Sequence, residues 1–274
     1  MLVKTYCAAV NGMEVTTVTI EVSLTNGIMY HFTGLGDEAV KEGRSRIAAA
    51  MQFNGYKFPH ADITVNMAPA DLRKEGSSFD LPLAIAILAA NGSIVSEVLD
   101  QYMMVGELSL DGTLQAVKGA LPIAIRARKE HFKGLIVPKQ NVREAAVVNN
   151  LEVYGMDSMV DVVQFLTGAK SFEPTVIDTR KEFYEHQYRF DLDYSDVRGQ
   201  ENVKRALEVA AAGGHNLIMV GPPGSGKSMM AKRLPTILPP LTLAESLETT
   251  QVHSIAGKLG ADTSLIAQRP FRAP

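Results

Sequence analysis

The sequence predicts an α/β protein with two domains, and three features of its 274 residues support this. Strand-like and helix-like segments alternate through residues 1–168, which predicts a first domain of strands and packed helices. Residues 169–190 lose this periodicity and carry many charges, so they are interpreted as a linker, with a solvated helix as the alternative. Residues 191–274 contain a glycine-rich loop between an apolar and a helical segment.

The composition is that of an ordinary globular protein, with 46% hydrophobic and 21% charged residues. A net charge of -3 argues against a strongly basic nucleic-acid binder, although a local basic patch stays open. Cys7 is the only cysteine, which excludes an intrachain disulfide and fits a reducing cytoplasm. No signal peptide is recognisable, and the apolar run Leu81–Ala90 is too short to cross a membrane.

Alternating β-branched residues predict a strand over Val15–Leu24. Asn26 and Gly27 predict a hairpin turn, because both tolerate positive φ, and residues 28–35 are expected to return as a second strand. Apolar residues spaced by three and four predict a helix from near Asp37 to Asn54.

The rest of the first domain continues this alternation. Residues 62–69 are expected as a strand, and residues 80–92 as a buried helix with Asp80 as its N-cap. Further elements are expected as a strand and turn over 102–112, a helix over 119–134, a strand over 135–138, a helix over 141–148, and a strand and helix over 151–168.

The segment "GPPGSGKS" matches the phosphate-loop pattern G-x-x-x-x-G-K-[ST]. Residues 216–221 before it are expected as a buried parallel strand, and the residues from Lys227 onward as a helix. The alternative is a simple Gly/Pro-rich turn. The expected nucleotide-binding residues are Gly221, Pro222, Pro223, Gly224, Ser225, Gly226, Lys227 and Ser228.

These residue types suit a triphosphate. Glycines let successive backbone N–H groups point at phosphate oxygens, and the helix N-terminus adds partial positive charge. Lys227 is expected to reach the β- and γ-phosphates of ATP, and the Ser228 hydroxyl to coordinate Mg²⁺.

Residues 196–216 resemble the segment that precedes the first helix of AAA+ ATPases. Val197, Gly199 and Gln200 match its V-x-G-Q element, and the resemblance implies that this element lines the adenine pocket, with Val197 and Gly199 as expected nucleotide-binding residues. The alternative is a turn with a helix cap.

Several motifs together, among them "DLRKEGSSFDLPLAIAILAANG", "GHNLIMVGPPGSGKSMMAKRLPTILPPL" and "RPFRAP", resemble the magnesium-chelatase-like AAA+ ATPases of the ComM (YifB) type. The resemblance implies a cytoplasmic ATPase that uses ATP and Mg²⁺, forms a homo-oligomeric ring (a hexamer), and does not associate with membranes. It further implies an ATP-driven DNA branch-migration motor in DNA uptake, natural transformation and recombination. A chelatase-type remodelling ATPase is the alternative, although the preceding domain favours the ComM type.

The first domain resembles the Lon-protease-like fold of the ribosomal protein S5 domain 2-like group. Ser78 falls at the position of the Lon nucleophile, but the position of its catalytic lysine falls on Leu121. Leucine cannot accept a proton, and Lys118 lies one helical turn earlier as a conceivable substitute. A non-proteolytic domain for docking, assembly or partner binding is therefore expected, with a Lon-like serine peptidase as the alternative.

Hydrolysis by this family needs an acidic pair after an apolar strand, but residues 229–274 contain no run of four apolar residues followed by Asp-Glu. Arg269 and Arg272 are interpreted as solvated charges, with contact to nucleic acid or a neighbouring subunit as the alternative. In the family, the stretch that matches "RPFRAP" lies inside the ATPase domain, so residues 191–274 are expected to form an incomplete domain. We expect this chain to bind ATP weakly or not at all, and not to hydrolyse it.

Overall fold

The computed structural model describes residues 2–260 and 262–272, and it confirms a mixed α/β fold. The chain divides into two compact units. The first contains the residues up to Ile177 together with Thr250–Ser264, and the second contains Asp178–Thr249 and the described residues from Leu265. Ala273 and Pro274, which end the "RPFRAP" motif, lie outside the described residues.

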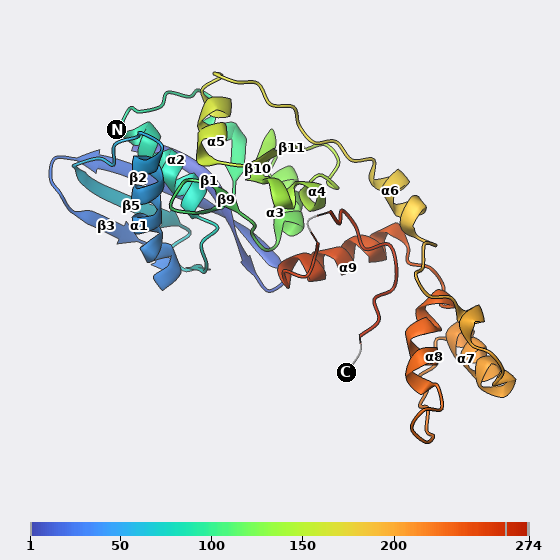
Figure 1. The fold of residues 1–274 in the computed structure, drawn as a ribbon. Coiled ribbons are helices and arrows are strands. Elements are labelled where there is room, and N and C mark those ends of the chain that lie inside the picture. Colours follow the sequence, from blue (N-terminus) through green and yellow to red (C-terminus); the bar gives the residue numbers. More distant parts are fainter. Residues whose placement is uncertain (1, 261, 273–274) are drawn as a thin grey trace. The chain divides into compact units, whose positions relative to one another are not determined.

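The first unit is built on a seven-stranded sheet with the order β11-β10-β7-β1-β2-β5-β3 (Figure 1). The pairs within β11-β10-β7-β1 and the pair β5-β3 are parallel, whereas β1-β2 and β2-β5 are antiparallel. Its strands are β1 (Leu2–Asn11), β2 (Glu14–Thr25), β3 (Tyr30–Thr33), β5 (Asp62–Ala68), β7 (Tyr102–Met104), β10 (Gly134–Pro138) and β11 (Glu152–Met156). Two small sheets pair β4 (Leu35–Gly36) with β6 (Arg73–Lys74) and β8 (Glu107–Leu108) with β9 (Leu114–Gln115).

The hairpin lies elsewhere than expected. The tight antiparallel hairpin joins β1 to β2, with Asn11 opposite Glu14 and Gly12 at a φ of +58° in the turn. The expected return strand after Gly27 is wrong, because β3 pairs in parallel with β5. Parallel strands need a crossover connection, and the helix α1 (Glu38–Phe53) provides it between β3 and β5.

Helices cover both faces of the sheet. The buried helix α2 (Asp80–Ala90) packs on β1 and β2, where Thr5 Oγ1 donates to the Pro82 carbonyl at 3.0 Å. α1 packs against α2 on the same side. On the opposite face, α3 (Ala120–Lys129) places Arg126 over Thr17 of β2. Two shorter helices, α4 (Val142–Ala145) and α5 (Met159–Leu166), accompany β11.

Asp37 and Asp80 were both expected at helix starts, and the expected N-cap role of Asp80 is wrong. Asp37 caps α1 as expected, because its Oδ1 accepts from the Val40 N–H at 2.9 Å. Asp80 is the first residue of α2, and its carboxylate caps nothing. It binds Arg46 of α1 instead, since pairing compensates the desolvation of a buried carboxylate.

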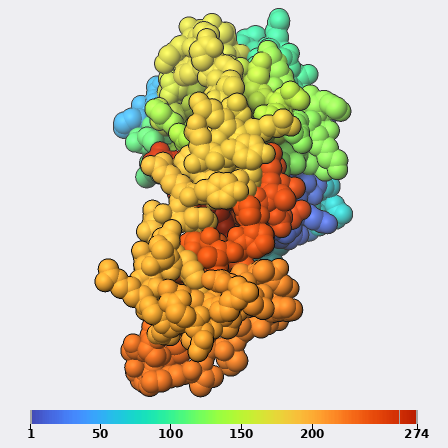
Figure 2. Space-filling view, turned by 90° about the vertical axis from the view of Figure 1, so that its right-hand side faces the viewer, coloured from blue at the N-terminus to red at the C-terminus, as the bar shows by residue number. Residues whose placement is uncertain are grey.

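The expected linker contains both extended chain and a helix. The Thr175 N–H donates to the Val153 carbonyl on the edge strand β11 at 2.8 Å. The helix α6 (Thr179–His186) follows, capped by Asp178. The chain before α6, drawn in yellow, runs along the surface that faces the viewer in Figure 2.

The second unit also contains α7 (Glu201–Gly213), α8 (Lys227–Arg233) and the first part of α9 (Leu243–Ile255). The buried strand expected over residues 216–221 is wrong, because these residues form no strand, and Ile218 and Val220 are 87% and 89% exposed. Within the described part of this unit no β-strand is present. Without a partner strand the backbone of this segment forms no sheet hydrogen bonds, and only Met219 packs against the small core of Val197, Leu207 and Met230, while Ile218 and Val220 stay exposed.

Short 3-10 helices occur at Leu99–Gln101, Lys139–Asn141, Tyr194–Asp196 and Leu234–Thr236. Among the helices formed by the described residues, none combines the length and apolar character needed to cross a membrane.

Candidate functional site

The candidate phosphate loop, Gly221–Ser228, connects the extended apolar segment to α8 in the second unit. Gly224 and Gly226 adopt left-handed backbone with φ of +80° and +84°. Gly226 directly precedes the first residue of α8. Residues with a side chain rarely adopt this conformation, so the sequence pattern and the loop geometry agree at these two positions.

The Lys227 side chain is hydrogen-bonded to residues of its own loop. Its ammonium group donates to the carbonyls of Gly221 and Pro222, both at 2.7 Å, and to the Ser225 hydroxyl at 3.1 Å. An ammonium has three donors, and these contacts use all of them. The side chain therefore bridges the two ends of the loop and puts a positive charge at its centre, where an anion would be attracted.

An adjoining cavity of about 440 Å³ extends between the loop and α7. Gly221, Pro222, Ser225 and Lys227 line its polar end. The apolar side chains that line it are Val203, Ala206, Leu207, Leu217, Ile218, Met219, Val220 and Met230. A charged end next to an apolar compartment suits a ligand with a flat ring and an anionic tail.

The predicted adenine-pocket residues Val197 and Gly199 are close in sequence to Gln200, which lines this cavity, but they do not line it themselves. Val197 is buried in a small core with Leu207 and Met230. Gly199 has a φ of +67°, and the following Gln200 lines the cavity. The contact of Val197 and Gly199 with adenine stays a prediction. Asn202 is a lining residue that the sequence had not predicted at the site, whereas Gln200 belongs to the predicted V-x-G-Q element.

An ion pair holds α8 to the segment before α7. Arg233 Nη2 lies 2.8 Å from Asp196 Oδ2, and Arg233 Nε donates to the Asp193 carbonyl at 3.0 Å. The hydrogen bond from Arg233 holds the pKa of Asp196 below its usual range. The helix that starts at the phosphate loop is thereby fixed at its other end.

Two further loop residues stand apart from these contacts. Ser228, the expected Mg²⁺ ligand, is an exposed residue in the first turn of α8. Pro223 is exposed at the outer part of the loop. Within the described residues, no cluster of three or more His, Cys, Asp or Glu side chains could hold a metal ion by itself. A bound Mg²⁺ would therefore need ligands from a nucleotide and from water.

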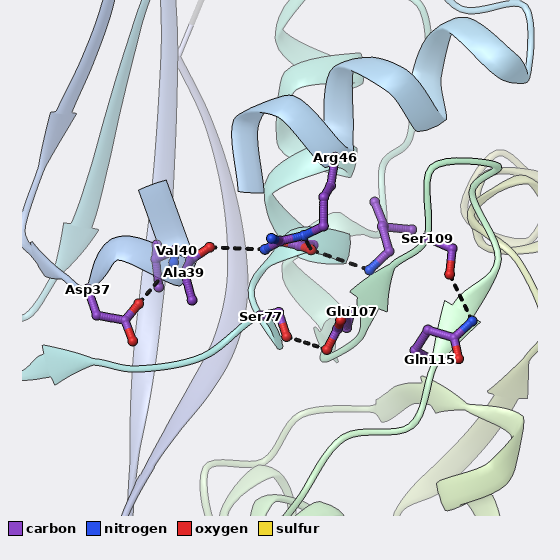
Figure 3. A network of polar contacts seen from close by, with 10 residues as sticks. Asp37, Ala39, Val40, Arg46, Ser77, Glu107, Ser109 and Gln115 are labelled. Atoms are coloured by element: carbon purple, nitrogen blue, oxygen red, sulfur yellow. Dashed lines mark hydrogen bonds and ion pairs between the residues drawn. The ribbon is translucent and has the colours of Figure 1, made fainter. Parts of the chain in front are cut away.

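The second candidate, Ser78 in the first unit, lies in the segment directly before α2. Its carbonyl accepts from the Gly106 N–H at 3.0 Å, and Leu121 is fully buried. Lys118 is exposed, and its aliphatic stem lies against Gly257. In the part of the chain that the structure describes, no hydrogen bond joins the Ser78 hydroxyl to a lysine, and the neighbouring Ser77 binds Glu107 (Figure 3).

Together, the two units define a class of protein: an α/β domain followed by a candidate P-loop nucleotide-binding unit. Comparisons with known proteins agree with this class. Residues 20–141 match the family model described as "Subunit ChlI of Mg-chelatase", and residues 193–274 match "Magnesium chelatase, subunit ChlI".

Relatives that match nearly the whole chain identify the family more specifically. The chain is 42% identical over 270 residues to competence protein ComM of Haemophilus influenzae, which covers 98% of this chain and 53% of the relative. It is 41% identical over 265 residues to the protein YifB of Escherichia coli, covering 96% of this chain and 51% of the relative. The chain belongs to the magnesium-chelatase-like family that includes ComM and YifB. It spans about half the length of the curated relatives it matches.

A weaker similarity concerns the first unit. Lon protease 2 of Syntrophobacter fumaroxidans is 25% identical over 122 residues, covering 43% of this chain and 15% of the relative. This fits the Lon-like fold expected for the first domain.

Proposed function

We propose that the second unit binds ATP together with Mg²⁺ at the loop Gly221–Ser228. The supporting observation is the position of Lys227, whose ammonium group closes a loop with two left-handed glycines beside an apolar cavity. The triphosphate would lie along the loop, and the base would enter the apolar part of the cavity. The residue types fit Mg²⁺ as well, because Ser228 supplies one hydroxyl and the phosphates supply the other oxygens.

Each residue has a defined task in this proposal. Lys227 balances the charge of the terminal phosphates, and the backbone around Gly224 and Gly226 accommodates them closely. Mg²⁺, when bound, would neutralise the charge that develops on the phosphates during transfer. Binding is expected to be weak, because the exposed segment before Gly221 leaves the loop without a sheet beneath it.

We further propose that the complete protein is an ATP-driven motor that acts on DNA during uptake and recombination, as a cytoplasmic, hexameric ring. The support is the 42% identity to a protein named for competence. A chelatase-type remodelling ATPase is the second candidate, supported by the family models, which describe a magnesium chelatase subunit. A Lon-like peptidase is less favoured, since Leu121 stands where the resemblance requires the lysine and no lysine among the described residues is hydrogen-bonded to Ser78.

Titration of the chain with Mg-ATP tests the nucleotide site. NMR is used to monitor the titration because it detects weak binding. Lys227→Ala should weaken binding at least about tenfold, since a charged hydrogen-bonding group is lost. Lys232→Ala, on the same helix and exposed, is the matched control and should bind as the wild type does. Equal affinity of all three proteins would refute the proposed site.

The proposed motor requires the full-length protein. ATP-stimulated branch migration of forked DNA, together with a hexamer in sedimentation experiments with ATP, would support it. ATP hydrolysis that DNA does not stimulate, without any branch migration, would favour the chelatase-type remodelling ATPase.

A further inference from the structure

Gln200 connects the starts of two helices in the second unit. Its backbone carbonyl accepts from the N–H groups of Val203 at 2.9 Å and Lys204 at 3.0 Å, so it begins α7. Its side-chain Nε2 donates to the carbonyl of Ser225 at 3.0 Å. Ser225 lies two residues before α8, and both Gln200 and Ser225 line the cavity beside the loop.

The backbone of Gln200 is unusual for its residue type. It has a φ of +58° and a ψ of +39°, in the left-handed region that glycine and asparagine tolerate best. Its side chain makes no capping bond to α7. This conformation directs the long amide side chain of Gln200 away from α7 and toward the phosphate loop. Glycine has no side chain to make this contact, and the side chain of asparagine is shorter.

The contact orients one peptide group of the loop. The carbonyl and the following N–H of a trans peptide point in opposite directions, so a carbonyl held toward Gln200 turns the Gly226 N–H away from it. The hydroxyl of the same serine donates to the Pro222 carbonyl at 2.9 Å and accepts from Lys227. Ser225 is thus fixed through its backbone by α7 and through its side chain by the loop.

We propose that Gln200 is a positioning residue for the phosphate loop, which it acts on through the Ser225 carbonyl rather than by contact with the nucleotide base. This inference rests on the proposed function, because it assigns Gln200 to the triphosphate part of the same site. The loop is held from one side by Gln200 and closed from within by Lys227.

Two substitutions of Gln200, made in the whole chain, separate the effect of its side chain from the effect of its left-handed backbone. Gln200→Glu keeps the length but replaces the donor with an acceptor, which cannot bond to a carbonyl. Gln200→Gly removes the side chain and favours the left-handed backbone. Glu201→Gln, at the neighbouring exposed position, is the control.

Binding of Mg-ATP and of inorganic tripolyphosphate should fall in both Gln200 variants, and further in Gln200→Glu, whose added negative charge also repels the anions. Loss of one neutral hydrogen bond corresponds to about 2- to 13-fold. Adenosine binding should not change. Wild-type affinity for tripolyphosphate with reduced affinity for adenosine would overturn the inference, because Gln200 would then act on the base. Wild-type affinity of Gln200→Gly for both anions would overturn it as well.

Amide hydrogen exchange without any ligand gives an independent readout. Exchange in residues 221–228 should accelerate in both Gln200 variants, whereas exchange within α7 and in the Glu201→Gln control should stay as in the wild type. Unchanged exchange in the loop would overturn the inference. If the wild type bound neither anion, the proposed nucleotide function would fail, while the exchange experiment would still decide whether Gln200 holds the loop.

Discussion

The ion pair between Arg46 and Asp80 gives the sharpest prediction about the first unit. Arg46 Nε and Nη2 bind the two carboxylate oxygens at 2.7 and 3.0 Å, and Arg46 Nη2 also donates to the Ala39 carbonyl. The Asp80 side chain is 3% exposed and that of Arg46 is 23% exposed. Among the described residues, the carboxylate accepts one further hydrogen bond, from the Leu108 N–H at 3.4 Å.

Arg46→Ala therefore leaves the buried Asp80 carboxylate with only the long hydrogen bond from the Leu108 N–H. Removing one partner of a buried pair costs about 3–5 kcal/mol, and we expect the lower end because Arg46 keeps some contact with water. A loss of about 3 kcal/mol lowers the urea midpoint by roughly 1–2 M at an m-value of about 2 kcal/mol/M. Far-UV circular dichroism in urea measures this loss, and hydrogen exchange in α1 and α2 assigns it to the first unit.

The loss should depend on pH. Burial raises the pKa of Asp80, and Arg46 opposes this rise, so its removal raises the pKa further. A carboxyl with a raised pKa contributes stability below its unfolded pKa and loses that contribution as pH rises. The deficit of Arg46→Ala should therefore shrink as pH falls from neutral toward the raised pKa.

Two controls complete the experiment. Arg44→Ala removes an exposed cation over the Tyr30 ring and should cost at most about 1 kcal/mol. The double variant Arg46→Ala, Asp80→Ala should be more stable than Arg46→Ala, because it no longer buries an unpaired charge. A cost below about 1 kcal/mol for Arg46→Ala, or a cost independent of pH, would refute the structural reasoning.

Three further predictions follow from single side chains. A fluorophosphonate should not label Ser78, and labelling that Ser78→Ala abolishes would establish a peptidase-like site after all. Burial raises the pKa of Glu144, so the contribution of this residue to stability should fall as pH rises from acidic to neutral; in urea titrations Glu144→Gln should gain stability relative to the wild type over this range, and a difference independent of pH would contradict it. Arg233→Ala should accelerate amide exchange in α8 and around Asp196, while unchanged exchange would show that the ion pair does not hold the helix.

Local signals in the sequence predicted most elements of the first unit. The period of apolar residues located α1 and β2, uninterrupted apolar runs located α2 and β10, and the strands β5 and β11 were predicted as well. Asp37 marked a helix start correctly. The phosphate-loop glycines were readable for the same reason, since positive φ at Gly224 and Gly226 is a local requirement. Periodicity and turn chemistry depend on neighbouring residues, so one sequence is enough to detect them.

The wrong predictions all depended on residues far apart in the chain. Asn26-Gly27 is as good a turn signal as Asn11-Gly12, but only the pairing of β3 with β5 decides which one closes a hairpin. Asp80 has the residue type of a cap, yet Arg46, 34 positions away, takes its carboxylate. The segment before Gly221 has the composition of a strand, and it remains exposed because the described second unit offers it no partner strand.

By itself, the sequence determined the mixed α/β class, the candidate loop with Lys227, and the lack of a lysine at the position of Leu121. Only the tertiary structure decided strand order, the partner of Asp80, and the contact from Gln200 to Ser225 across 25 positions. The physical reason is the same in each case. Propensities and motifs act over a few residues, whereas pairing, burial and charge compensation depend on which distant groups folding brings within hydrogen-bonding distance.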